Sequence, residues 1–240
     1  MTSPKVDALV SDLFRREFPH LVAALVRLLG PAKLTLAEDV VQDALISAMQ
    51  AWRFGAPDNP KAWILQVAKH RAIDILRRDS RLESSDASPD QHASGTLEAA
   101  VDIALSPEAD GENQLAMMFA ICDDALSSDT HVTLILRLLC GLSPSEIARA
   151  FLIDVSTIDR RLHRGRTRLQ ELGQLQQVRD RDVQARQASV EQALYLLFNE
   201  GYHGSDADNP LQPGLCADAL RLVELLLEAN AIDRNTVHAL

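Results

Sequence analysis

Residues 142–169 limit what this chain can fold into more than any other stretch, because they contain two short helical patterns separated by a break. The sequence Ser-Pro-Ser-Glu at 143–146 fits the start of a helix, with a serine cap, a proline at the first position and a glutamate that completes a capping box. The pattern breaks at 152–155, and Ser156 or Thr157 can begin a second helix. That helix keeps its apolar residues on one stripe, and its other faces are basic.

Two short helices joined by a tight turn, the second rich in arginine, are typical of a DNA-reading helix-turn-helix. An α-helix fits the major groove of DNA, where guanidinium groups can bind phosphates or guanine edges. A solvated basic helix on an ordinary helical bundle is the alternative that this stretch leaves open.

The composition favours an all-α protein. The 240-residue chain is rich in Ala, Leu and Arg, and it contains only ten glycines and ten prolines. No apolar run approaches the roughly 20 residues that cross a membrane, and the N-terminus lacks the apolar core of a signal peptide. We therefore expect a soluble cytoplasmic protein with no membrane partner.

The net charge of −10 is unevenly distributed along the chain. Residues 82–114 contain eight acidic side chains and no Lys or Arg, and residues 182–240 carry a net charge of −6. The remaining residues have a net charge of +4. Because local charge governs attraction to a polyanion, the acidic total does not exclude binding to DNA.

The first 81 residues read as one domain of three helices, over 5–29, from Thr35 to about Trp52, and over 61–81. The second helix carries a polar cluster near its start, which could simply complement the helix dipole. The cluster consists of Glu38, Asp39, Gln42 and Asp43. The third helix is basic, and Trp63 near its start can either stack on an unpaired base or belong to the core.

The later residues divide into three parts. Residues 82–113 are rich in Ser, Asp, Ala and Gly, so we expect a flexible acidic linker with at most a transient helix at 97–105. Helical patterns resume at 115–140, and with the helix-turn-helix they make a small domain over 114–173. Residues 174–240 form a separate acidic extension with two amphipathic helices, which must pack on the earlier domains, on another chain or on further helices.

No motif of enzyme or metal chemistry is visible. Cys122, Cys140 and Cys216 are isolated, which argues against a disulfide framework or a zinc site and favours buried reduced thiols. The chain has no phosphate-binding glycine loop, no His-Glu-x-x-His and no nucleophile elbow. We expect no catalytic activity, no metal and no cofactor.

Three stretches occur in a specific order around the acidic linker. They are Ala-Glu-Asp-Val-Val-Gln-Asp-Ala at 37–44, the stretch 59–78 that begins Asn-Pro-Lys-Ala-Trp-Ile-Leu and ends Arg-Ala-Ile-Asp-Ile-Leu-Arg-Arg, and the helix-turn-helix at 142–169. Together, over about residues 5–173, they resemble the extracytoplasmic-function sigma factors of bacterial RNA polymerase. The resemblance implies two promoter-binding domains, σ2 and σ4, in a protein that directs core polymerase to promoters and assists strand opening.

The resemblance also implies roles for individual residues. The cluster Glu38, Asp39, Gln42 and Asp43 would dock on the clamp helices of the polymerase β′ subunit, and σ4 would contact the β flap. The loop before the third helix, and that helix, would open the −10 element and capture a flipped base. The residues implied there are Asp58, Asn59, Lys61, Trp63, Lys69, Arg71, Arg77 and Arg78. The second helix of the helix-turn-helix would read the −35 element through Ser156, Thr157, Arg160, Arg161, His163, Arg164, Arg166 and Arg168.

The extension carries a second resemblance. Ala-Leu-Tyr-Leu-Leu-Phe-Asn-Glu-Gly-Tyr at 193–202, followed by Leu-Cys-Ala-Asp-Ala-Leu-Arg-Leu at 215–222, is similar to the start of the helical extension in one subgroup of these sigma factors. That extension is similar to tetratricopeptide-type repeats and usually runs further, so either a truncated chain or a short natural form is implied. It would act as a built-in regulator, or it would only complete a hydrophobic core. Residues 199–202 could be a ligand site or simply the turn that ends a helix.

The alternative function is a stand-alone helix-turn-helix regulator, which needs dimer symmetry and no polymerase contact. The basic helix with Trp63 and the acidic cluster on the second helix favour the sigma factor.

Overall fold

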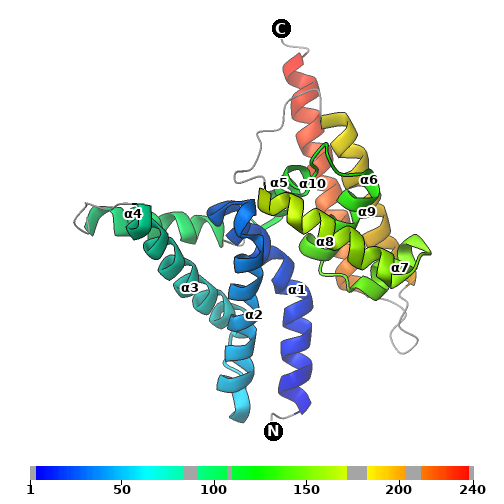
Figure 1. Cartoon of the computed structure of the whole chain (residues 1–240). Helices are drawn as coiled ribbons and strands as arrows, with labels where there is room; N and C mark the ends of the chain where they lie inside the picture. The colour runs from blue at the N-terminus through cyan, green and yellow to red at the C-terminus, as the bar shows by residue number, and fades with distance from the viewer. Residues whose placement is uncertain (1–3, 84–90, 107–109, 172–182, 204–211, 238–240) are drawn as a thin grey trace. The chain divides into compact units, whose positions relative to one another are not determined.

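The computed structural model describes residues 4–83, 91–106, 110–171, 183–203 and 212–237 (Figure 1). Within these ranges every regular element is a helix and no strand occurs, which confirms the all-α prediction. The chain divides into two compact units, residues 1–110 (unit 1) and 111–240 (unit 2), and we describe each by itself. None of the helices in the described ranges has the length and apolarity needed to cross a bilayer.

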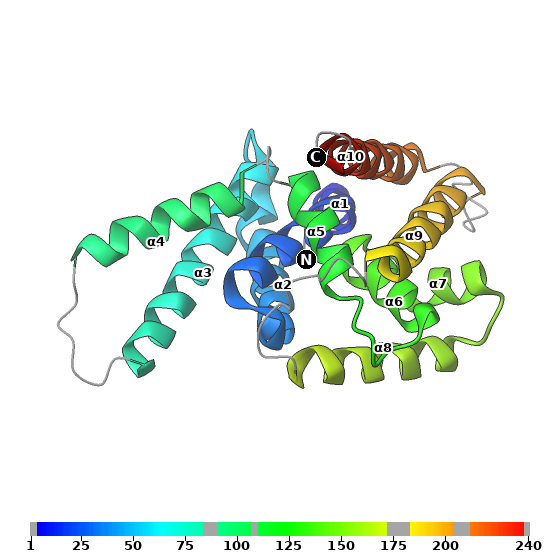
Figure 2. The same ribbon diagram turned by 90° about the horizontal axis from the view of Figure 1, so that it is seen from above.

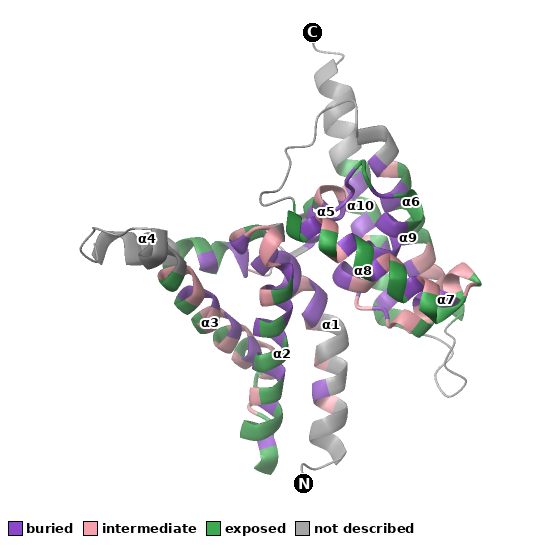
Figure 3. Ribbon diagram, in the orientation of Figure 1, coloured by how far each residue is buried: buried purple, intermediate pink, exposed green. Residues whose placement is uncertain are grey.

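Unit 1 is built around three long helices. Its described helices are α1 (Pro4–Leu29), α2 (Leu34–Ala51), α3 (Pro60–Glu83) and α4 (Gln91–Ala104). α1 packs along α2, and both contact α3. Apolar side chains spaced three or four residues apart fill the interface, and Leu25, Val41 and Ile64 are completely buried. Figure 3 shows buried residues recurring along α2 and α3. α2 begins one residue before the expected Thr35, directly after a short 3₁₀ turn over Pro31–Lys33.

The region that we expected to be a flexible linker contains a helix that packs on unit 1. α4 contacts both α1 and α3, and Val101 of α4 is completely buried. Low apolar content suggested no structure, but the spacing of Leu97, Val101 and Ala104 gives α4 one narrow apolar stripe. Residues 84–90 and 107–109 of the expected linker lie outside the described residues.

Unit 2 contains the helix-turn-helix and the C-terminal extension. Its described elements are α5 (Asp110–Ala120), α6 (Ser128–Leu134), a π-helical continuation of α6 over Ile135–Leu139, α7 (Pro144–Phe151), α8 (Val155–Glu171), α9 (Val183–His203) and α10 (Pro213–Val237). α6 and its continuation form the centre, where Leu134, Ile135 and Leu136 are completely buried. α6 lies between α8 and α9 and contacts both (Figure 2).

The extension shares a folding unit with the helix-turn-helix, which is one of the arrangements that the sequence left open. α9 packs on α6, on its π-helical continuation and on α7, and α10 packs along α9. Val190, Leu194 and Leu197, the apolar face seen in the sequence, are buried there. The expected boundary at residue 173 lies outside the described residues.

Gly201 does not end a helix, as one interpretation of the sequence had it, because α9 continues to His203. A Cβ atom at Gly201 would lie 2.9 Å from the backbone nitrogen of Cys216 on α10. Glycine therefore permits the close approach of α9 and α10. The sequence also predicts a polar loop over residues 204–214, of which 204–211 lie outside the described residues.

The three cysteines are free thiols, two of them buried. Burial raises the pKa of the Cys122 thiol to about 12, and it also raises the pKa of the Cys140 thiol. Both thiols are therefore protonated at neutral pH and poor nucleophiles.

Candidate nucleic-acid interface

The helix-turn-helix has the cap that the sequence predicts. Ser143 Oγ accepts a hydrogen bond from the Glu146 N–H at 3.2 Å, and the Glu146 carboxylate accepts one from the Ser143 N–H at 2.6 Å. Leu152 takes the left-handed conformation, with φ of 55°, and ends α7. α8 begins at Val155, one residue before the expected start. The turn between the two helices is thus short and well defined.

One side of α8 packs on α6. Ile158, Leu162 and Leu169 are buried on this side, with Gly165 between them. A Cβ atom at Gly165 would lie 2.7 Å from both methyl carbons of Leu134 on α6. The absence of a side chain at this position sets how closely α8 approaches α6.

The opposite side of α8 presents polar and basic side chains. Arg160 donates hydrogen bonds to the Ser156 carbonyl at 3.2 Å and to the Thr157 hydroxyl at 3.1 Å. Its guanidinium is thereby held beside the first turn of α8, where recognition helices contact base edges. This face consists of Ser156, Arg160, His163 and Arg164, which are exposed, and Thr157 and Arg166, which are half-buried.

Two arginines that the sequence assigned to DNA make ion pairs inside unit 2. Arg161 donates to the carboxylate of Asp129 on α6 at 2.5 Å, and its guanidinium lies 5.1 Å from the centre of the Phe151 ring. Arg168 donates from Nε to the carboxylate of Asp123 at 2.8 Å. Both guanidinium groups therefore hold α8 to the rest of unit 2.

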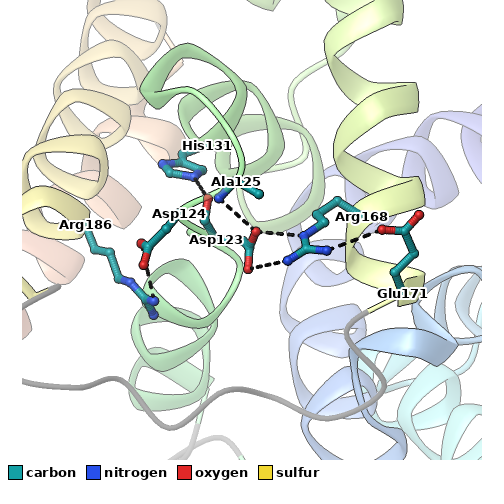
Figure 4. Close-up of polar contacts among 7 residues, drawn as sticks. All are labelled: Asp123, Asp124, Ala125, His131, Arg168, Glu171 and Arg186. Carbon is teal, nitrogen blue, oxygen red and sulfur yellow. Dashed lines mark hydrogen bonds and ion pairs between the residues drawn. The ribbon is translucent and has the colours of Figure 1, made fainter.

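Asp123 is a buried carboxylate in the turn between α5 and α6 (Figure 4). Its Oδ1 accepts hydrogen bonds from Arg168 Nε and, at 3.1 Å, from the Ala125 N–H. Burial alone would raise the pKa of this carboxyl, but these hydrogen bonds and the charges of Arg168 and Arg186 outweigh burial and lower the pKa below its usual value. Asp123 is therefore ionised at neutral pH and can hold Arg168.

The polar cluster on α2 is divided between buried and exposed side chains. Glu38 is buried, whereas Asp39, Gln42 and Asp43 are exposed. The carboxylate of Asp43 accepts a hydrogen bond from Arg71 of α3 at 2.5 Å. Of the four residues predicted to form one docking surface, three are accessible and one of those is paired.

Two apolar side chains that sequence reasoning missed lie one and two turns further along α2. Ile46 is 50% exposed and Met49 is 38% exposed. They follow Asp39 and Gln42 at intervals of seven residues, which is the spacing of one helical face. The exposed face of α2 is therefore acidic at its start and apolar towards its end.

The loop before α3 and the first turn of α3 are tied to unit 1 by polar contacts. Asn59 Oδ1 accepts a hydrogen bond from the Ala62 N–H at 3.0 Å and so caps α3, and Asp58 is exposed. Lys61 makes an ion pair with Glu17 of α1 at 2.9 Å. These contacts hold Asp58 and Asn59 at the start of the basic helix.

Trp63 combines the two roles that the sequence left open. Its ring lies edge-on to the buried ring of Trp52, with 5.4 Å between ring centres, yet the residue is only half-buried. Part of the Trp63 side chain therefore remains at the surface of α3.

The basic side chains further along α3 are paired with acids of α4. Lys69 contacts Asp102 at 2.5 Å, and Arg77 contacts Glu98 at 2.8 Å. Arg78 is exposed. Sequence reasoning missed these acids as specific partners, although their spacing of four residues within a helical pattern puts both on one face.

The capped helix-turn-helix of unit 2 is an arrangement typical of helical DNA-binding proteins. Comparison with known protein families identifies which helical regions the chain contains. Residues 13–82 match Sigma-70 region 2, residues 124–169 match Sigma-70, region 4, and residues 186–240 match a family of unknown function, DUF6596. Two regions of the sigma-70 family, region 2 and region 4, thus match this chain in that order.

Two relatives show how far the similarity extends. The chain is 34% identical over 215 residues to an uncharacterized protein of Rhizobium meliloti (strain 1021), which covers 87% of this chain but only 49% of that protein. It is 25% identical over 163 residues to RNA polymerase sigma factor YlaC of Bacillus subtilis (strain 168), covering 68% of this chain and 90% of that protein. The chain thus spans about half the length of the R. meliloti relative. No solved structure matches the chain.

Proposed function

We propose that this chain is a sigma factor that directs bacterial core RNA polymerase to promoters, recognises −35 and −10 elements and assists strand opening. One observation carries the proposal: an arginine-bearing recognition helix with a free outer face, α8, occurs in the same chain as a region 2 match. In this role the chain supplies contacts to DNA and polymerase, and the polymerase performs the chemistry.

For the −35 element, we assign base contacts to the exposed face at the start of α8. Ser156, Arg160 and Arg164 reach outward, and hydroxyl and guanidinium groups are suited to base edges and phosphates. Thr157 and His163 border this face, and Arg166 is suited to a phosphate. Arg161 and Arg168 are assigned to holding α8, because their guanidinium groups already pair with Asp129 and Asp123.

For the −10 element, we assign base capture to the loop before α3 and strand binding to α3. Extruding a base costs a few kcal/mol of stacking, which a pocket and an aromatic platform offset. Asp58 and Asn59 would form the pocket, with Trp63 as the platform. Arg78, which is exposed, would contact a phosphate directly. Lys61, Lys69, Arg71 and Arg77 would contact phosphates only by exchanging their acidic partners Glu17, Asp102, Asp43 and Glu98 for DNA.

For core polymerase, we assign the exposed face of α2. Asp39, Gln42 and Asp43 would bind basic residues of the β′ clamp helices, and Ile46 and Met49 would add apolar area, since interface cores combine apolar anchors with a polar rim. Glu38 is removed from this surface because it is buried. Region 4 would contact the β flap, as the family resemblance implies.

The extension would act within the chain, on region 4. Support comes from the packing of α9 on α6 and α7 in the same folding unit as α8. An intramolecular regulator needs such a contact.

The test is co-purification of the full chain with bacterial core RNA polymerase, followed by run-off transcription from a pool of genomic promoter fragments. We expect stoichiometric binding and transcripts whose start sites share −35 and −10 sequences. Failure to bind polymerase, with duplex DNA still retained, would indicate the stand-alone regulator.

A charge-reversal pair sharpens this test. Asp39→Arg should abolish polymerase binding, because it puts a cation where the acidic start of α2 would meet a basic partner. Glu224→Arg, an equal charge change at an exposed position of α10, should leave binding unchanged. Equal binding by both variants would exclude α2 as the docking surface.

A further inference from the structure

The residues Asp123–His131, which we call the junction segment, contact the recognition helix on one side and the extension on the other. They comprise the turn after α5 and the first turn of α6. Sequence reasoning attached no role to them. Their contacts to α8 and to α9 are polar and specific.

On the side of α8, the junction segment supplies two carboxylates. Asp123, which is buried, accepts from Arg168 at 2.8 Å, and Asp129 accepts from Arg161 at 2.5 Å. The two arginines are seven residues apart, so the carboxylates hold α8 at two points that lie about two turns apart on the same side of the helix. Rotation of α8 about its axis would break both pairs.

On the side of α9, the junction segment supplies two further contacts and one charge pair. The Ser189 hydroxyl lies 3.0 Å from the Ser128 hydroxyl and 3.4 Å from His131 Nδ1. Arg186, one turn earlier on α9, is buried and lies 3.7 Å from the Asp124 carboxylate (Figure 4). These contacts come from the first turns of α9, directly after the residues that separate α8 from α9.

The two sides are connected through His131. Its Nε2 donates a hydrogen bond to the Asp123 carbonyl oxygen at 2.8 Å, which leaves Nδ1 as an acceptor for the Ser189 hydroxyl. Asp123, whose carbonyl binds His131, holds Arg168 with its carboxylate. A continuous series of polar contacts therefore runs from Ser189 through His131 and Asp123 to Arg168.

We propose that α9 positions the recognition helix through the junction segment, with Ser189 and Arg186 as positioning residues for −35 recognition. The inference rests on the proposed function of α8. Because a buried polar network has few alternative arrangements, its loss at the α9 end lets the carboxylates at the α8 end move. The extension is then part of the −35 reading unit, and its residues determine how sharply α8 discriminates sequences.

The first test is amide hydrogen exchange of the full-length chain, without DNA. Ser189→Ala removes a hydroxyl that contacts both Ser128 and His131, and Arg186→Met removes the buried charge. We expect amides of α8 around Leu162 and Leu169 to exchange about 3- to 10-fold faster in both variants, the change that loss of one or two hydrogen bonds allows in a local opening equilibrium. The helices of unit 1 should exchange as in the unmodified chain.

The control and the rescue exclude a general loss of stability. Glu200→Gln changes another buried polar residue of α9, one that lies 3.9 Å from Arg149 of α7 and outside the junction segment, and it should leave α8 protected. Ser189→Thr keeps the hydroxyl and should restore protection of α8. Unchanged exchange of α8 in Ser189→Ala and Arg186→Met would overturn the proposal, as would equal acceleration in α7, α8 and α10.

The second test measures DNA selectivity. The full chain, bound to core polymerase, selects duplexes from a random-sequence pool, and sequence enrichment is compared among variants. Ser189→Ala should flatten the enrichment while total duplex binding and its salt dependence stay unchanged, because phosphate contacts remain. Enrichment equal to that of the unmodified chain would overturn the proposal. If the unmodified chain enriches no sequence, the proposed function fails, whereas the exchange result still decides whether α9 positions α8.

Discussion

Gly165→Ala tests whether the close approach of α8 to α6 governs the stability of unit 2. Helix propensity alone predicts that Gly165→Ala stabilises α8, because alanine favours a helix over glycine by about 1 kcal/mol. The structure predicts the opposite. The new Cβ atom would lie 2.7 Å from both methyl carbons of Leu134 and 2.9 Å from its Cγ.

The size of the destabilisation by Gly165→Ala depends on how far the Leu134 side chain can move away from the added methyl group. Its side chain is completely buried, and Ile135 and Leu136 beside it are also completely buried. Overpacking of such a core costs about 1–3 kcal/mol. After the gain of about 1 kcal/mol in helix propensity is subtracted, we expect a net loss of about 0–2 kcal/mol in the free energy of unfolding.

The assay separates the two units. Far-ultraviolet circular dichroism during urea unfolding follows the helices of both units, whereas tryptophan fluorescence follows unit 1, because Trp52 and Trp63 are the only tryptophans. Gly165→Ala should lower the midpoint seen by circular dichroism and leave the fluorescence midpoint unchanged. Gly214→Ala is the matched control: no atom lies within 4 Å of its added Cβ, so it should be neutral or slightly stabilising.

A double-mutant cycle with Leu134→Ala identifies the cause. Alone, Leu134→Ala should destabilise by about 2–5 kcal/mol, because it leaves a cavity. In the Gly165→Ala background the loss should be smaller by about 1–2 kcal/mol, since the added methyl group occupies part of that space. Additive losses, or a Gly165→Ala variant more stable than the unmodified chain, would refute the reasoning.

Three further predictions follow from charged groups. Glu98→Gln with Asp102→Asn should remove the ion pairs of Lys69 and Arg77 with α4 and raise affinity for a single-stranded oligonucleotide at low salt about 3- to 10-fold, measured by fluorescence anisotropy; a gain no larger than that of Glu224→Gln would contradict it. Burial and the charge of Arg186 lower the pKa of His131 in the folded state. As the pH falls, the imidazole is therefore protonated more readily in the unfolded chain than in the folded one, and unit 2 should lose stability below about pH 6.5. His131→Gln should flatten that dependence in thermal melts, and an unaltered dependence would exclude His131 as its source. Replacing Arg168 by Ala should lower the unfolding midpoint of unit 2, whereas Arg164→Ala, at an exposed position, should weaken only DNA binding; equal midpoints would contradict the assignment.

The helix-turn-helix could be predicted from sequence because its determinants are local. The cap at Ser143, the proline after it and the break before α8 act over a few residues, and each appears in the structure where the sequence puts it, to within one residue. The same holds for the apolar stripes of α2 and α3. Local rules suffice wherever a helix start, a helix stop or a period of 3.6 residues carries the information.

The association of helices was less predictable. The amphipathic faces of α9 and α10 required partners, but periodicity does not say which partner, so the earlier domains, another chain and further helices all stayed open. Gly201 was similarly ambiguous: a glycine near a pattern's end fits a helix terminus, whereas in the structure it permits contact with α10. Composition also misjudged α4, because Val101 and Ala104 are buried in α4 despite the acidic, serine-rich sequence around them.

The arginines of α8 show where sequence reasoning about a binding site ends. A helix turns 100° per residue, so Arg160, Arg164 and Arg168 follow one another in steps of about 40°, and Arg161 lies beside Arg168 on the same side of the pattern. Which of these arginines face DNA depends on where the acids lie, and Asp123 and Asp129 are more than thirty residues earlier in the chain. Because a guanidinium group serves equally well in an ion pair or on a phosphate, residue type could not distinguish the two groups. The partners distinguish the two groups. Arg160 and Arg164 lie on the exposed face assigned to DNA, whereas Arg161 and Arg168 pair with acids of unit 2 and fix the orientation of that face.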